Sequence, residues 1–178
     1  IEPSLYWNLA LFAKEITSNA NYDNSIGSEI VIGIHEDANN SIVNGEDQEI
    51  FPLSSISSNQ IMGSYTNLSI NNNDISSNYR DIRSYHETSI TWDLEGESVL
   101  PFDPAQGIIF TWEFSGNDDP YDYHLYISNQ EVNMKELSSV NVSSIHFLEE
   151  MNIRAELKEE YIGCTHPLAS NYNLTSEG

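Results

Sequence analysis

Strict two-residue alternation in short segments limits the fold of this 178-residue chain more than any other feature. In "GIIFTWEF", apolar Ile108, Phe110, Trp112 and Phe114 alternate with other residues. Successive side chains of a strand point to opposite faces, so such a segment has one face for a core. Similar segments are "LYWNLALFA", "EIVIGIH", "TSITWDLEG" and "YHLYIS", with weaker alternation in "QIMGSYTNL", "YRDIRSY" and "VNVSSIHF". Gly, Pro, Asn and Asp separate them, which predicts an all-β, antiparallel sandwich of the immunoglobulin-like or jelly-roll-like kind.

Two segments need separate interpretation. The composition of "FLEEMNIRAELKEEYI" favours a helix, yet Met151, Ile153, Ala155 and Leu157 alternate with polar residues, so we predict a closing strand. The acidic stretch "HEDANNSIVNGEDQEIF" has little periodicity and is predicted to be a long loop. We expect one sandwich domain over residues 1–162, followed by a short cysteine-containing tail over 163–178.

The charge of the chain restricts its partners. Twenty-eight acidic residues face six basic ones, which gives a formal net charge of −22. Such a surface repels nucleic acid and anionic membranes, so we expect neither as a partner. No apolar run approaches the roughly 20 residues of a membrane helix, so we expect no insertion into a membrane. Two of the rare cations, Arg80 and Arg83, fall on one face of a predicted strand, where we expect acids to pair with them.

No familiar catalytic motif is present. The sequence contains no G-x-S-x-G elbow, P-loop, H-E-x-x-H or G-x-G-x-x-G motif. A single cysteine excludes a four-thiolate zinc site, and the five histidines are scattered along the chain. We therefore predict that the chain is not an enzyme.

Calcium is the one cofactor that the sequence indicates. Calcium binds several hard oxygen ligands in a flexible loop. "GNDDPYDY" offers Asp118, Asp119 and Asp122, and "HEDANNSIVNGEDQE" offers Asp37 and Asp47. Neither loop has the spacing of an EF-hand, so the alternative is that these acids are simply solvated.

The aromatic residues allow two interpretations. Trp7, Trp92 and Trp112 fall on the apolar sides of their segments, so we expect them in the core. Several tyrosines are freer to be exposed and to line a sugar-binding face: Tyr65, Tyr79, Tyr85, Tyr121 and Tyr126.

The tail "GCTHPLASNYNLTSEG" resembles a short repeat of large secreted bacterial proteins, of the form G-C-T-D-P-x-A-x-N-Y-N-x-x-A-x-x-D-D-G-S-C. His166 stands where the repeat usually has Asp, and the second cysteine of the repeat would fall beyond Gly178. The resemblance implies a truncated repeat in which Cys164 forms a disulfide with that later cysteine. It also implies a secreted protein in an oxidising exterior.

The preceding residues resemble a module of the same kinds of proteins. The matching elements are "YWNLALFA", "IGIHEDANN", "YRDIRSY", "TWDLEG", "IIFTWEF" and "EVNMKELSS". The acidic loop departs most from the pattern of the module, so the resemblance gives little support to a calcium site in this loop. The resemblance implies a non-catalytic, extracellular β-sandwich that sits beside enzymes, adhesins or surface-layer parts.

We therefore predict a structural or adhesive module of a cell-surface or filamentous assembly, whose partners are copies of itself or other surface proteins. Self-association by strand addition would use the apolar N-terminal segment, with Leu5, Trp7, Leu9 and Leu11 as the exchanged residues. The alternative is that this segment pairs within its own sheet. A second functional alternative is a carbohydrate-binding module with a polysaccharide as its partner.

Overall fold

A computed structural model describes residues 6–16, 27–35, 38, 48–49, 65–71, 77–84, 88–99, 107–116, 119–143, 147 and 149–159. These residues are dominated by strands, and none of their helices is long and apolar enough to span a bilayer. The strands are β1 (Tyr6–Glu15), β2 (Ser28–His35), β3 (Gln48–Glu49), β4 (Tyr65–Asn71), β5 (Ser77–Ser84), β6 (Ser89–Val99), β7 (Ile108–Gly116), β8 (Tyr121–Ile127), β9 (Gln130–Asn133), β10 (Ser139–Val142) and β11 (Met151–Leu157).

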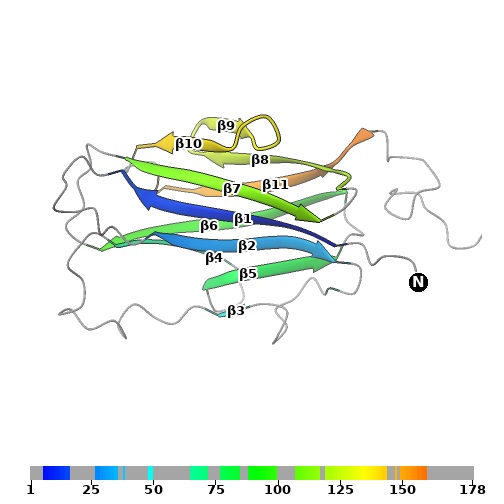
Figure 1. Ribbon diagram of the computed structural model, residues 1–178, viewed down its shortest axis with the longest axis horizontal. Coiled ribbons are helices and arrows are strands. Elements are labelled where there is room, and N and C mark those ends of the chain that lie inside the picture. Colours follow the sequence, from blue (N-terminus) through cyan, green and yellow to red (C-terminus); the bar gives the residue numbers. More distant parts are fainter. Residues whose placement is uncertain are drawn as a thin grey trace, which may run out of the picture.

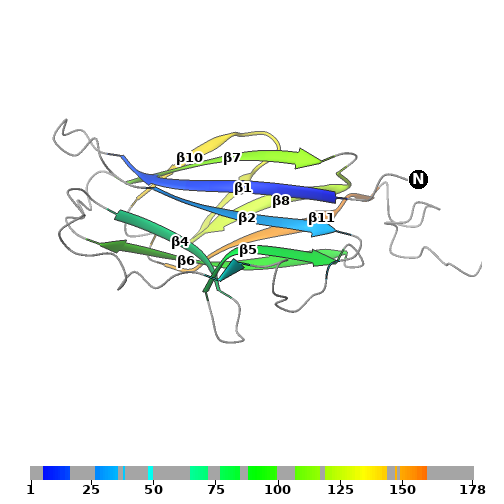
Figure 2. The same cartoon turned by 60° about the horizontal axis from the view of Figure 1, so that its bottom comes forward.

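The strands form two packed layers, which confirms the predicted β-sandwich (Figures 1 and 2). The hydrogen-bonded order is β10-β7-β1-β2-β5-β4-β6-β11-β8-β9, with β3 paired to β5. The front layer in Figure 1 contains β10, β7, β1, β2 and β5, and the back layer contains β4, β6, β11, β8 and β9. One detail differs from a purely antiparallel sandwich, because β2 and β5 pair in parallel.

Strand β1 lies inside the front layer, with a partner on each edge. It pairs antiparallel with β2 along one edge and with β7 along the other. Trp7, Leu9, Leu11 and Ala13 are all buried, because the odd positions of this strand face the core. The N-terminal segment therefore pairs within its own sheet, as the alternative to strand exchange predicted. Leu5 lies outside the described residues.

The closing strand predicted from alternation is confirmed as β11. It lies between β6 and β8 and is antiparallel to both. Its inward residues Met151, Ile153, Ala155 and Leu157 are buried, so tertiary packing overrides the helix-favouring composition. Within the predicted long loop at residues 35–51, the two residues of β3 pair with β5.

Aromatic side chains fill much of the core, as expected from the three tryptophans. The ring of Trp7 meets Tyr121 edge-on with 6.5 Å between centroids, and Phe110 packs on Phe147 at 5.9 Å. The Trp112 Nε1–H donates a 2.8 Å hydrogen bond to the carbonyl oxygen of Met134. The expectation that Tyr121 is freer to be exposed is wrong, because it shares the inward parity of Tyr123 on β8.

An ion pair lies at the margin of the core. The Asp81 carboxylate accepts hydrogen bonds from Nε and Nη2 of Arg83 at 3.0 and 2.8 Å. Arg83 also donates to the Thr91 carbonyl and lies 5.6 Å from the ring of Trp92, so it ties β5 to β6 across the sandwich. Arg80 is three positions from Arg83 and therefore points to the other face of β5, which corrects the prediction of a shared face.

We expect Asp81→Asn to destabilise the fold by about 1.5–3 kcal/mol, because the Asp81 side chain is only 6% exposed and Arg83 would lose its charged partner. Urea unfolding measures this change. Glu156→Gln is the matched control, because the Arg154–Glu156 pair is 46% and 52% exposed and should contribute about 0–1 kcal/mol. Equal effects of the two substitutions would contradict the structural role of Asp81.

We expect Gly96→Ala to lower the free energy of unfolding by about 1–3 kcal/mol. A Cβ at Gly96 would lie 2.3 Å from the Phe147 carbonyl oxygen and 2.8 Å from its ring. Ser89→Ala, at an exposed position of the same strand, should change stability by about 0.5 kcal/mol or less. A Gly96→Ala protein as stable as the wild type would show that β6 does not pack this closely on Phe147.

Candidate binding sites on the outer faces

The back layer presents a polar outer face built by strand register. One row across β6, β11, β8 and β9 contains Asp93, Asn152, Tyr126 and Glu131. The neighbouring row contains Thr91, Arg154, His124 and Asn133. The alternate residues of the same strands are in the core, so this face carries the polar half of each alternation.

Four side chains of this face interact, and we name them the Tyr126 cluster: His124, Tyr126, Glu131 and Arg154. The Glu131 carboxylate lies 2.6 Å from Nδ1 of His124 and accepts a 3.1 Å hydrogen bond from the Tyr126 hydroxyl. His124 stacks on Tyr126 with 6.3 Å between ring centroids, and the Arg154 guanidinium lies 5.7 Å from the Tyr126 ring. Partial burial is the largest cause that raises the pKa of Tyr126 above its ordinary value, and the hydrogen bond to Glu131 raises this pKa further. These contacts hold the tyrosine ring in one orientation.

A hollow adjoins this cluster at the end of β8, and we name it the Tyr126 hollow. The β8–β9 turn forms one wall, and the residues just before β11 form another. The Ser128 amide donates a 3.4 Å hydrogen bond to the Glu150 carbonyl, which connects the two walls. The hollow is lined by Tyr126, Ser128, Asn129, Glu149, Glu150 and Asn152.

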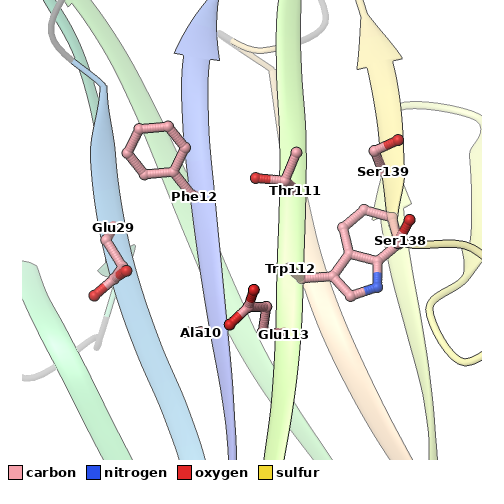
Figure 3. Close-up of a pocket in the computed structure, with 8 residues that line it drawn as sticks. All are labelled: Ala10, Phe12, Glu29, Thr111, Trp112, Glu113, Ser138 and Ser139. Atoms are coloured by element: carbon pink, nitrogen blue, oxygen red, sulfur yellow. The ribbon is translucent and has the colours of Figure 1, made fainter.

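A second concavity, the β1–β7 groove, crosses the outer face of the front layer (Figure 3). Phe12 and Ala10 come from β1, and Thr111 and Glu113 from β7 beside it. Glu29 on β2 flanks the groove on one side, and Ser138 and Ser139 lie on the β10 side (Figure 3). The groove thus combines the apolar side chains of Phe12 and Ala10 with two carboxylates and three hydroxyl side chains.

In the segment "GNDDPYDY", predicted as a calcium site, the structure describes Asp119 and Asp122. Asp119 accepts a 2.7 Å hydrogen bond from Lys135 Nζ and a 3.1 Å bond from the Tyr121 amide. The same ammonium lies 3.8 Å from the Phe114 ring centroid. Asp122 has the outward parity of β8, opposite to Tyr121 and Tyr123. The carboxylate of Asp119 is therefore paired with a lysine, and calcium binding in this segment stays a prediction.

Tyr123 lies in the same group of contacts. Its hydroxyl donates a 3.5 Å hydrogen bond to Asp119, and its ring packs on Phe114 with 5.0 Å between centroids. Burial raises the pKa of Tyr123 well above its ordinary value, and the charge of Asp119 adds to this shift. Through Tyr123 and Lys135, Asp119 therefore connects β8 to the turn after β9, and both of these partners contact Phe114 of β7.

The other predicted ligands and the predicted disulfide remain predictions. Asp37, Asp47, Asp118 and Cys164 lie outside the described residues. In the described part of the chain, no group of three or more His, Cys, Asp or Glu side chains is placed to hold a metal ion.

Comparison with known proteins gives no relative for this chain. No family model, curated protein or solved structure matches it.

The sequence predicts only part of the Tyr126 cluster. Tyr126 was expected to be available for a sugar-binding face, and it is outward and half-buried. Tyr79 packs against the core, while the side chains of Tyr65 and Tyr85 are outside the described set. His124 and Arg154 were missed as members of a common site, because only the β8–β11 register brings them side by side.

We expect Lys135→Met to destabilise the protein by about 1 kcal/mol, because the substitution keeps the aliphatic stem but removes the charge held by Asp119 and Phe114. The loss should be the same in calcium and in a chelator, as measured by thermal unfolding. If the chelator alone destabilised the wild type while Lys135→Met had no effect, Asp119 would be serving calcium and not Lys135.

Proposed function

We propose that this chain is a non-catalytic, extracellular structural or adhesive module that associates with copies of itself through the outer face of its front layer. The observation that carries the proposal is the β1–β7 groove. A sheet face turned to water usually has polar residues at its outward positions. Here the outward, half-buried positions of β1, β2 and β7 include Ala10, Phe12, Val31 and Ile109.

The position of β1 favours association through a face over donation of this strand. Both edges of β1 are paired, and Trp7, Leu9 and Leu11 are buried. Donating the strand would require separation from both neighbours and exposure of these side chains. Contact between groove surfaces leaves every strand in place and buries apolar area already on the outside.

The shape of the polar sites supports binding and not catalysis. Enzyme active sites are usually concave and exclude water from the reacting groups. The His124–Glu131 pair lies on an open sheet face, and the Glu131 side chain is 55% exposed. A rigid, open face of this kind suits recognition of a partner.

The net charge of −22 opposes contact between copies and makes it depend on ions. Salt screens such repulsion, and calcium bound at joints would reduce it further. An exterior rich in salt or calcium is the environment in which this acidic module would associate. The same environment agrees with secretion, which the resemblance of the tail implies.

A carbohydrate-binding module is the second candidate. One observation favours it: an outward tyrosine, Tyr126, is fixed in orientation beside a hollow with amide and carboxylate groups. Aromatic rings with a few oriented polar groups are common in sites for small ligands. This candidate uses the back layer, whereas self-association uses the front layer.

Light scattering across protein concentrations tests the proposed function, at low and high salt and with calcium or a chelator. We expect larger species at high salt or in calcium and a clear shift toward monomer in Phe12→Ser, because this change adds a polar group to the floor of the groove. Tyr126→Ala, on the opposite face, is the matched control and should associate like the wild type. A monomer under every condition would contradict self-association.

A further inference from the structure

We infer that the Tyr126 hollow is a binding site for a neutral saccharide. The inference rests on the second candidate function given above and is independent of self-association through the β1–β7 groove. It assigns the ligand to one end of the back layer, where β8, the β8–β9 turn and the start of β11 meet.

The ring of Tyr126 provides the apolar surface of the site. One face of a pyranose ring presents C–H groups, and an aromatic side chain offers a flat apolar surface against which these can pack. Glu131 holds the Tyr126 hydroxyl, His124 stacks on the ring, and the Arg154 guanidinium lies over the ring at 5.7 Å from its centroid. A ring ordered before binding loses little conformational entropy when a ligand packs on it.

The walls of the hollow supply groups that suit hydroxyls. Carboxylates accept hydrogen bonds, whereas asparagine amides both donate and accept them. A saccharide hydroxyl can also do both, and its hydrogen bonds to an ionised carboxylate are among the stronger ones. Such groups surround the hollow at Asn129, Glu149, Glu150 and Asn152.

The turn at Ser128 is a further sign of a constrained site. Ser128 has φ of 53°, and it is the first residue of a two-residue loop between β8 and β9. Glycine is the residue that tolerates positive φ at this position of a hairpin. Ser128 lines the hollow in this conformation, and residues in sparsely populated backbone regions cluster at functional sites.

The charges around the hollow select among saccharides. Glu149 and Glu150 line it, and the whole chain has a net charge of −22. Uronate or sulfate groups would be repelled by this field. The site therefore fits an uncharged polysaccharide chain and disfavours an acidic one.

A printed array of neutral oligosaccharides, which includes glucans, mannans, xylans and galactans, provides the first test. Calorimetry with the strongest array ligand then gives its dissociation constant. We expect Tyr126→Ala to weaken binding by about tenfold or more, because it removes the packing surface. Tyr126→Phe should bind within about threefold of the wild type, since the ring remains. Circular dichroism and thermal unfolding establish that each variant is folded.

Phe12→Ser is the matched control on the other face, and it should bind the oligosaccharide like the wild type whether or not the protein self-associates. Loss of association with retained saccharide binding would support both assignments separately. Three results would overturn the inference. The first is that the wild-type protein binds no neutral oligosaccharide on the array. The second is that Tyr126→Ala and Asn152→Ala both bind like the wild type. The third is that the protein binds alginate more tightly than any neutral ligand.

Discussion

The pairing of β1 on both edges is the constraint on which the rest of the structure depends. Its backbone joins β2 to β7, and its buried side chains Trp7, Leu9 and Leu11 reach into the core shared with the back layer. Trp7 meets Tyr121 at the beginning of β8, so one strand fixes contacts in both layers. Because β1 occupies this position, the outer face of the front layer is a continuous surface whose side chains have cross-strand neighbours.

The two outer faces differ in chemistry, and this difference separates the two proposed kinds of binding. The front layer has the half-buried Phe12 and Ala10 in a groove that also contains the carboxylates of Glu29 and Glu113. The back layer is polar. In the paired rows of β6, β8, β9 and β11, its outward aromatic residues are Tyr126 and His124. A contact between copies needs apolar area, whereas a saccharide needs an oriented ring beside hydrogen-bonding groups. Each face supplies one of these, so a module could hold a polysaccharide and a second copy at the same time.

Alternation predicted the strands well, because the side chains of a half-buried strand must alternate in polarity. This reasoning found β7, β8 and β11, including the case in which composition pointed to a helix. Alternation does not show which strands are neighbours in the sheet. The parallel β2–β5 pair and the Lys135–Asp119 contact depend on chain crossings that leave no local pattern. For the same reason, the sequence gives no sign that Lys135, 16 residues after Asp119, pairs with its carboxylate.

Amide hydrogen exchange of β1 tests the central claim most directly. If β1 is the fixed centre of the front layer, the amides of Leu9 and Leu11 should exchange only through global unfolding and be among the slowest in the protein. Their protection should not depend on protein concentration, even where light scattering detects association. Exchange of these amides as fast as that of edge strand β9, or protection that rises with concentration, would contradict the account and show that β1 is available for exchange between chains.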